Sequence, residues 1–310
     1  MFIFYFLFIS YLLVILIINY INMDLSSVKM VVFDMDGVLR VGSKVIPGAQ
    51  NIFRTLNSRG IKTMIVTNEC RYGEKVLRDD LTEMGVKLPD NTKIITSAMS
   101  VYKYLKKKVE RFSDDHFYIG ILGESGLYNT LTKICKYKNV DLCEEPPEDF
   151  NEVKSRLFLV LGTLDKIKIA NLEKALKWVN AGCKIIITCD DMSDPSSKGD
   201  FSIGMPKHTL HMINFTVKTN YYSLGKPNPM IAELIRKECC EGDSKIEDNE
   251  VLFVGDTIYT DIKLAEESGF KSALVLSGNT KQEAIKNYVT EADIVFDSVL
   301  ELERAFLDLN

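Results

Sequence analysis

The fold of this chain is most constrained by an apolar run, residues 29–33, that ends in Asp34-Met35-Asp36-Gly37. A short run without polar alternation is typical of a strand that is buried on both faces, as strands are in parallel α/β sheets. Such sheets place their ligands beyond the carboxyl ends of the strands. Gly37 lets the backbone turn sharply directly after the two carboxylates. The segment therefore predicts a parallel α/β sheet with Asp34 and Asp36 at its functional edge.

Two further segments carry groups that suit a phosphate. The strand-like run 61–66 ends in Thr67-Asn68, whose hydroxyl and amide can donate hydrogen bonds to phosphate oxygens without adding charge. Lys226, in the turn 225–229, precedes a helix that proline helps to start. Taken singly, Thr-Asn is also an ordinary strand end, and Gly-Lys-Pro is an ordinary turn.

A fourth segment suits a metal ion. The apolar run 251–255 ends in Asp256, and Asp261 follows at the entry to a predicted helix over 262–269. Both carboxylates can face one cation, and magnesium prefers oxygen ligands of this kind. A capping aspartate in a plain strand–turn–helix segment is the alternative interpretation.

In this order, the segments strand-DxDG, strand-TN, GKP and strand-GDxxxxD resemble the haloacid dehalogenase superfamily of phosphohydrolases, from about residue 28 to the end. The resemblance implies a magnesium-dependent phosphomonoester hydrolase that works through an aspartyl-phosphate. Its substrate is then a small phosphorylated metabolite, such as 2-phosphoglycolate, pyridoxal phosphate, glycerol phosphate or a sugar phosphate, with p-nitrophenyl phosphate as a generic substrate. A protein that kept this fold and binds phosphate ligands with weak or no turnover is the alternative.

The resemblance also implies roles for individual residues. Asp34 is expected to be the nucleophile, and Asp36 the general acid that protonates the leaving oxygen and then deprotonates water. Thr67 and Asn68 are expected to bind the substrate phosphate. Lys226 is expected both to bind that phosphate and to act in catalysis, by offsetting the charge on nucleophile and phosphoryl group.

The cofactor that the resemblance implies is Mg²⁺. It is expected to be bound by the carboxylates of Asp34 and Asp256 and by the backbone carbonyl of Asp36. Asp261 is expected to support the site through a water molecule or by contacting the residues that bind the metal. Positioned donors and cations of this kind supply most of the catalysis in phosphoryl transfer.

Spacing predicts where a second domain is inserted. Only 33 positions separate Asp34 from Thr67, whereas 157 residues lie between Asn68 and Lys226. The longer interval alternates strand-like and helix-like segments, which predicts a parallel sheet of its own. We therefore expect a Rossmann-like, doubly wound, mostly parallel core with an inserted smaller α/β cap. The predicted ranges are 28–111 and 220–310 for the core and 112–219 for the cap. This arrangement resembles the large-cap (class IIA) branch, which includes p-nitrophenylphosphatases and phosphatases of phosphoglycolate and pyridoxal phosphate.

Short helices and strands are expected to alternate along residues 49–188. Helices are predicted over 49–59, 73–85, 98–107, 126–136 and 169–181, and strands over 93–96, 117–122, 156–161 and 184–188.

Two places depart from the family's pattern and leave specificity open. Glu69-Cys70 stands where relatives usually have Asn-Ser, and the cap loop 188–209 lacks the usual glycines. Cys70 is interpreted as a small, partly buried side chain, with oxidation-sensitive activity as the alternative. His208 and His211 are interpreted as surface residues at a helix start, because no third metal ligand is evident.

Charge and cysteine content exclude some classes of function. The formal charge is −5, so the chain has no basic footprint for nucleic acid. Its seven cysteines show no metal-ligand spacing, which indicates reduced thiols in a cytoplasmic protein. A homodimer through the cap is implied by the resemblance alone.

The leader, residues 1–22, conflicts with a simple cytoplasmic enzyme. Residues 2–21 carry no charge and are long enough for a transmembrane helix. They lack the basic start and cleavage site of a signal peptide. The alternatives are a membrane anchor, a signal peptide, and translation that truly begins at Met23.

Overall fold

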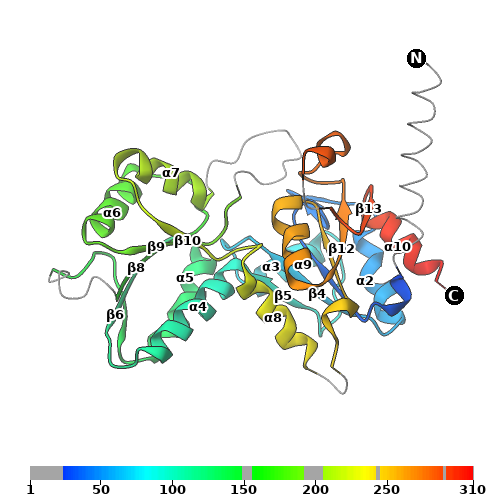
Figure 1. The fold of residues 1–310 in the computed structure, drawn as a ribbon, viewed down its shortest axis with the longest axis horizontal. Helices are drawn as coiled ribbons and strands as arrows, with labels where there is room; N and C mark the ends of the chain where they lie inside the picture. Colours follow the sequence, from blue (N-terminus) through cyan, green and yellow to red (C-terminus); the bar gives the residue numbers. More distant parts are fainter. Residues whose placement is uncertain (1–23, 149–155, 192–204, 242–244, 289–290, 310) are drawn as a thin grey trace, which may run out of the picture. The chain divides into compact units, whose positions relative to one another are not determined.

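The structure is a computed structural model that describes residues 24–148, 156–191, 205–241, 245–288 and 291–309 (Figure 1). The leader 1–22 and its alternative start at Met23 lie outside these residues, as does the part 192–204 of the cap loop. Among the helices of the described ranges, none is long and apolar enough to cross a membrane.

The chain divides into two compact units. The first unit comprises the described parts of 1–64, 85–92 and 242–310, and the second those of 65–84 and 93–241. The predicted limits of core and cap, at residues 112 and 219, stay a prediction.

Parallel strands with buried side chains form the frame of the first unit. These strands are β1 (Met30–Phe33), the start of β4 (Lys62–Thr67), β11 (Val251–Gly255), β12 (Lys271–Val275) and β13 (Ile294–Phe296), in the order β13-β12-β11-β1-β4. In register, Val32 lies beside Phe253, and Val254 beside Ala273. The uniform burial of β1 and β11 explains why each reads as an unbroken apolar run. Parallel pairing of β1 with β11 places the residues that follow these strands at one edge of the sheet.

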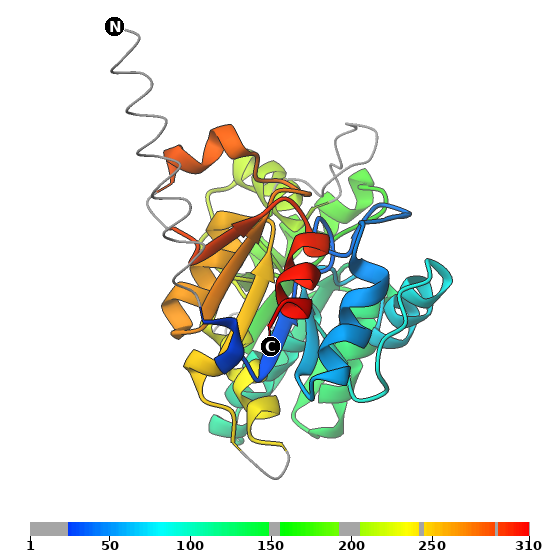
Figure 2. The same cartoon turned by 90° about the vertical axis from the view of Figure 1, so that its right-hand side faces the viewer.

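The helical segments of the first unit are short. They are α2 (Ala49–Ser58), α9 (Lys263–Ser268), α10 (Val299–Leu307), the 3₁₀ turns η1 (Leu25–Ser27), η4 (Asp248–Glu250) and η6 (Gln282–Asn287), and the π turn η5 (Ile258–Ile262). Helices α2 and α10 lie side by side (Figure 2), where the buried Thr55 hydroxyl donates to Glu303 at 3.1 Å. A small hairpin, β2 (Arg40–Val41) with β3 (Lys44–Val45), follows the turn after β1.

The second unit holds a five-stranded sheet in which every neighbouring pair is parallel. Its order is β10 (Tyr221–Ser223), β9 (Lys184–Ile187), β8 (Leu157–Leu161), β6 (Phe117–Leu122) and β7 (Val140–Leu142). The unit also contains β5 (Lys93–Thr96), α3 (Glu74–Glu83), α4 (Ser97–Arg111), α5 (Ser125–Leu131), η2 (Thr132–Lys136), α6 (Ile169–Asn180), α7 (Pro206–Thr216) and α8 (Pro229–Cys239).

Helices cover both faces of this second sheet. On one face Phe158 and Val160 of β8 pack with α4 and α5, and on the other Leu159 packs with α6 and α7, because successive strand residues point to opposite faces. Trp178 of α6 is fully buried, and a Cβ at Gly120 would lie 2.5 Å from its ring. The predicted α/β fold with parallel sheets is confirmed. The predicted helix over 126–136 is α-helical only to Leu131 and continues as a 3₁₀ turn.

Candidate active site

Asp34 is held at the carboxyl end of β1. Its side chain is buried, and its N–H donates to the Val254 carbonyl of β11 at 2.8 Å. Gly37 closes the turn by donating to the Arg40 carbonyl at 2.7 Å and has a φ of 90°. A Cβ on Gly37 would lie 2.3 Å from an oxygen of Asp256. Only glycine therefore suits this position, both for its backbone angle and for the space available.

The Asp36 carboxylate forms an ion pair with Arg40, in the hairpin that follows. Arg40 Nε donates to Asp36 Oδ1 at 3.0 Å, and the arginine side chain is only 10% exposed. The group of neighbouring carboxylates described below contains Asp34 but not Asp36. No sequence signal had pointed to Arg40.

Asp256 stands at the end of β11 in a tight cradle of donors. Thr257 Oγ1 donates to its Oδ1 at 3.0 Å, and the Asn279 N–H donates to its Oδ2 at 2.5 Å. The Asn279 amide donates in turn to Thr257 Oγ1 at 3.1 Å. These donors hold the Asp256 carboxylate in one orientation.

Asp261 uses its carboxylate to shape the turn after β11. Its Oδ2 accepts the backbone N–H groups of Asp256 at 3.1 Å and Thr257 at 3.0 Å, and the residue is fully buried. It belongs to the π turn η5, whereas sequence analysis had predicted a plain helix that begins at residue 262. Asp261 thus fixes the backbone beneath Asp256.

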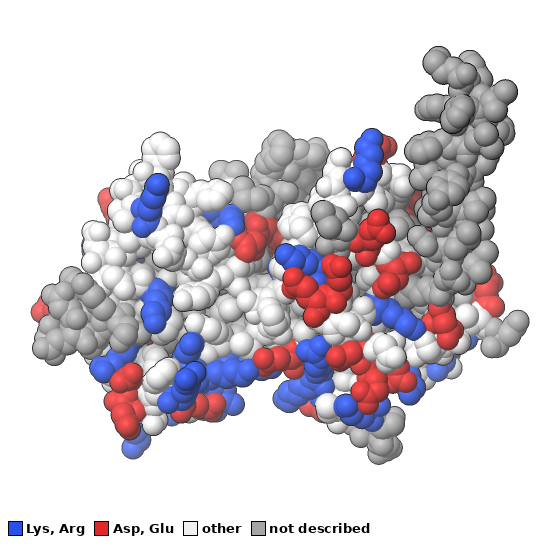
Figure 3. Space-filling view, viewed as in Figure 1, with Lys and Arg blue, Asp and Glu red and all other residues white. Residues whose placement is uncertain are grey.

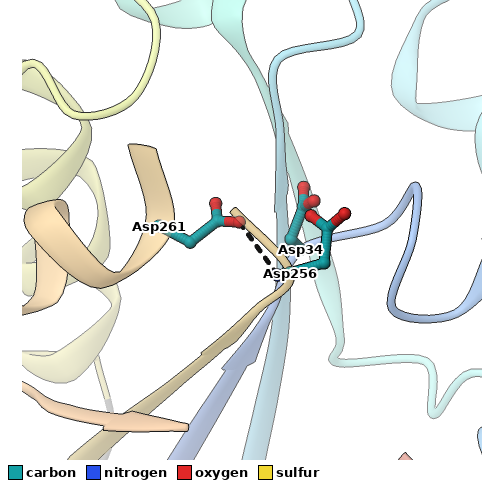
Figure 4. A group of neighbouring side chains, drawn as sticks. All are labelled: Asp34, Asp256 and Asp261. Atoms are coloured by element: carbon teal, nitrogen blue, oxygen red, sulfur yellow. Dashed lines mark hydrogen bonds between the residues drawn. The ribbon is translucent and has the colours of Figure 1, made fainter. Parts of the chain in front are cut away.

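Three of the predicted carboxylates come together in the first unit. Asp34, Asp256 and Asp261 each offer an oxygen within 4.8 Å of the others, and all three are buried (Figure 4). Buried like charges are costly unless a cation neutralises them. Buried carboxylate oxygens are the ligands that Mg²⁺ prefers, so these residues fit that ion. Within the described residues, no comparable group contains His208 or His211, which lie on α7.

Thr67 is the last residue of β4 and Asn68 follows it, both in the second unit. Both are buried, and Thr67 Oγ1 accepts the Glu69 N–H at 3.0 Å, which leaves its own hydroxyl proton to be donated. The Asn68 amide oxygen accepts the Lys226 N–H at 2.9 Å. Lys226 is 2% exposed, and its Nζ donates to the Val66 carbonyl at 3.2 Å. The structure thus brings Thr67, Asn68 and Lys226 together.

Glu69 and Cys70, which depart from the family's pattern, are both accommodated by neighbouring residues. Glu69 is bound by Arg71 through the backbone N–H at 2.6 Å and through guanidinium bonds of 2.5 to 3.1 Å, which neutralise its charge. Cys70 is fully buried, not partly as predicted, and its Sγ accepts the Thr163 N–H at 3.4 Å. Burial raises the pKa of the Cys70 thiol, so it stays protonated at neutral pH and is a poor nucleophile.

Known proteins resemble the chain in both sequence and fold. A family model described as haloacid dehalogenase-like hydrolase matches residues 31–134, and one described as HAD-hydrolase-like matches 223–302. The chain belongs to the haloacid dehalogenase-like hydrolases. The predicted family is thereby confirmed. The two matched ranges contain the three grouped carboxylates and also Thr67, Asn68 and Lys226.

Several relatives of these hydrolases align over most of their length. The sugar-phosphatase AraL of Bacillus subtilis is 27% identical over 88% of this chain and 92% of its own. The 4-nitrophenylphosphatase of Schizosaccharomyces pombe is 28% identical over 87% and 90%. The solved 4-nitrophenylphosphatase of Thermotoga maritima has a TM-score of 0.75 at 26% identity and covers 91% of this chain and 98% of its own.

Proposed function

We propose that this chain is a magnesium-dependent phosphomonoester hydrolase that works through a phosphorylated Asp34. The observation that carries the proposal is the buried group of Asp34, Asp256 and Asp261 beyond two parallel strands. The relatives named as a sugar phosphatase and as 4-nitrophenylphosphatases support a small phosphorylated substrate. The proposed substrates are those predicted from the sequence: phosphoglycolate, pyridoxal phosphate, glycerol phosphate or a sugar phosphate.

The proposed metal ligands are the oxygens of Asp34 and Asp256 and the backbone carbonyl of Asp36, with Asp261 in support. When bound, magnesium screens the negative charges of the nucleophile and the phosphate from each other. The donors on Asp256 hold its carboxylate in one orientation before the ion arrives. That preorganisation favours binding, because little freedom remains to be lost.

Two carboxylates are proposed to carry the covalent chemistry. An Asp34 oxygen attacks phosphorus, and the bond between phosphorus and the leaving oxygen breaks while Asp36 gives that oxygen a proton. A water molecule then attacks phosphorus in the phosphorylated Asp34 while Asp36 takes its proton. The bond between phosphorus and the Asp34 oxygen breaks, which releases inorganic phosphate and leaves Asp34 ionised and Asp36 protonated again. Asp36 is 25% exposed, which leaves it accessible to both the leaving group and water.

The phosphate of the same substrate is proposed to bind the second group of residues. Thr67 has a hydroxyl proton to donate, and the buried ammonium of Lys226 supplies a positive charge that does not depend on the metal. Charge spreads over the equatorial oxygens in the transition state, so donors fixed in advance lower its energy. The order of these segments along the chain supports the assignment.

The alternative is a phosphate-binding protein without turnover. Its main support is Glu69 and the altered cap loop 188–209. An acidic side chain beside the phosphate-binding residues would repel a substrate. The Arg71 ion pair removes most of that charge effect.

Hydrolysis of p-nitrophenyl phosphate by the full chain tests the proposal. We expect turnover in magnesium, loss of turnover in excess EDTA and recovery when magnesium is restored. A panel of phosphoglycolate, pyridoxal phosphate, glycerol phosphate and sugar phosphates then ranks the substrates by kcat/KM. A folded protein that binds vanadate but turns over none of them in magnesium would instead support the non-catalytic alternative.

Thr257→Val is expected to weaken metal binding by about tenfold or more. Valine fills the space of threonine but cannot donate to Asp256 Oδ1, and it leaves the Asn279 amide without its acceptor. Thr257→Ser keeps the hydroxyl and serves as the matched control. The dissociation constant of Mn²⁺, followed by electron paramagnetic resonance, measures the effect without any turnover. Equal Mn²⁺ affinity in the valine and serine variants would show that the hydroxyl does not orient the ligand.

A further inference from the structure

We propose that Asp191 is a positioning residue of this site, acting on Lys226 through the Asn68 side chain. The three groups concerned, the Asp191 carboxylate, the Asn68 amide and the Lys226 backbone N–H, are called the Asn68 bracket below. The catalytic consequence of this inference rests on the proposed function. The hydrogen bonds themselves do not depend on that function, and all three residues lie in the second unit.

Both ends of the Asn68 amide are occupied by protein. Its Nδ2 donates to Asp191 Oδ2 at 2.7 Å, and its Oδ1 accepts the Lys226 N–H at 2.9 Å. The Asn68 side chain and its bond to Lys226 are buried, whereas Asp191 is half-buried. A flipped amide would set nitrogen against N–H and oxygen against carboxylate, so only one orientation is allowed. The amide therefore joins the segment that follows β9 to the turn before α8.

The turn before α8 is packed closely against the same amide. A Cβ on Gly225 would lie 2.6 Å from the Asn68 amide oxygen and 2.3 Å from the Thr188 carbonyl. Side chains of L-residues do not fit there, so the backbone of this turn approaches both β4 and β9 directly. A shift of the Asn68 amide is thus transmitted to Gly225 and Lys226 without an intervening flexible side chain.

Lys226 is fixed at two points on either side of Thr67. Its backbone N–H is bound by Asn68, and its Nζ donates to the Val66 carbonyl at 3.2 Å. The ammonium group is therefore held over the end of β4, where Thr67 offers its hydroxyl. This assigns the Asn68 side chain a different part from the one predicted: it places the cation and is not itself the main phosphate donor.

Asp190 provides a matched control for Asp191. It precedes Asp191 in the chain, and its carboxylate binds Lys207 Nζ and accepts from the Tyr221 hydroxyl at 3.3 Å. The two neighbouring carboxylates thus serve different partners: Asp190 serves α7 and β10, and Asp191 serves Asn68. A change at Asp190 removes an equal charge from the same turn and leaves the Asn68 bracket intact.

An exchange of the two side chains tests the bracket. Asn68→Asp alone sets two carboxylates against each other, and we expect kcat/KM for p-nitrophenyl phosphate to fall by about 10- to 100-fold. Adding Asp191→Asn restores both hydrogen bonds with one donor and acceptor reversed, and we expect activity within about threefold of the wild type. Adding Asp190→Asn instead is expected to restore nothing. Asp191→Asn alone keeps an acceptor for the amide and is expected to change little.

Failure of rescue would overturn the proposal. If Asn68→Asp with Asp191→Asn stays as inactive as Asn68→Asp, the amide donates to the phosphate directly. Binding of inorganic phosphate, measured by calorimetric titration, reports the same difference without turnover, since a lost phosphate donor weakens that binding in both variants. Melting temperature gives a readout that does not depend on the proposed function. Asn68→Asp should lower it, and Asp191→Asn, but not Asp190→Asn, should restore it even if the wild type hydrolyses no phosphomonoester.

Discussion

Asp34→Asn is expected to lower kcat for p-nitrophenyl phosphate by about 10³-fold or more. The amide has the shape of the carboxylate, so the variant keeps the packing at the end of β1, but its oxygen is a poor nucleophile. The Asp34 backbone bond to Val254 does not involve the side chain and is unaffected. Asp90→Asn changes an exposed aspartate to the same residue and is expected to retain wild-type turnover.

Trapping of the intermediate sharpens this test. Borohydride reduction after brief mixing with substrate should mark Asp34 in the wild type and leave Asp34→Asn unmarked by mass spectrometry. Retention of more than about a tenth of the wild-type kcat would be far too much for the loss of a nucleophile and would move that role to another residue.

The same variant should separate catalysis from stability. Asp34, Asp256 and Asp261 are buried together, and neighbouring like charges oppose each other when no cation is present. In EDTA, Asp34→Asn is therefore expected to melt at the same temperature as the wild type or at a higher one. The rise in melting temperature on adding magnesium should be smaller in the variant, because a ligand that binds the folded state less tightly stabilises it less.

The sequence predicted the parts of the site that local chemistry determines. The buried strands β1 and β11 carry unbroken apolar runs, and parallel pairing brings their ends to the same edge, so Asp34 and Asp256 were found together. The groups that orient them were not found. Thr257 and Asn279 are 22 positions apart, and Asn68 and Asp191 are 123 apart. No pattern in the sequence encodes such pairs, because packing between distant segments decides them.

Short or mixed elements escaped prediction for a related reason. Strands β2, β3 and β10 have two or three residues each, too few for a periodic pattern to emerge. The segment over 126–136 reads as one helix, but β-branched Thr130, Thr132 and Ile134 are poor helix formers. The α-helix accordingly ends at Leu131 and a 3₁₀ turn follows.

Basic side chains on the surface have acidic neighbours. On the face drawn in Figure 3, basic and acidic side chains of the described residues are interspersed. Lys103 and Lys107 of the basic run on α4 are both paired with Glu233. These ion pairs neutralise part of the positive charge along α4.

Gly278→Ala is expected to weaken Mn²⁺ binding and lower kcat/KM by about 100-fold, at the upper end of what second-sphere changes cause. A Cβ at Gly278 would lie 1.9 Å from Asp256 Oδ2 and 2.5 Å from its Cγ. The carboxylate cannot yield easily, because Thr257 and the Asn279 N–H hold one oxygen each. The overlap must also lower the melting temperature, since forced packing in a filled site costs about 1–3 kcal/mol.

Two other glycines separate the possible causes of that loss. Gly73 has no atom within 4 Å of an added Cβ and a φ of −82°, so Gly73→Ala should leave Mn²⁺ affinity unchanged. Gly37 faces the same Asp256 oxygen at 2.3 Å and in addition has a φ of 90°. Gly37→Ala should therefore match Gly278→Ala in metal affinity and melt at a lower temperature, because it adds backbone strain to the overlap. If both variants melt lower but bind Mn²⁺ as tightly as the wild type, Asp256 is not a metal ligand. The magnesium site proposed for this hydrolase would then have to be built on other residues.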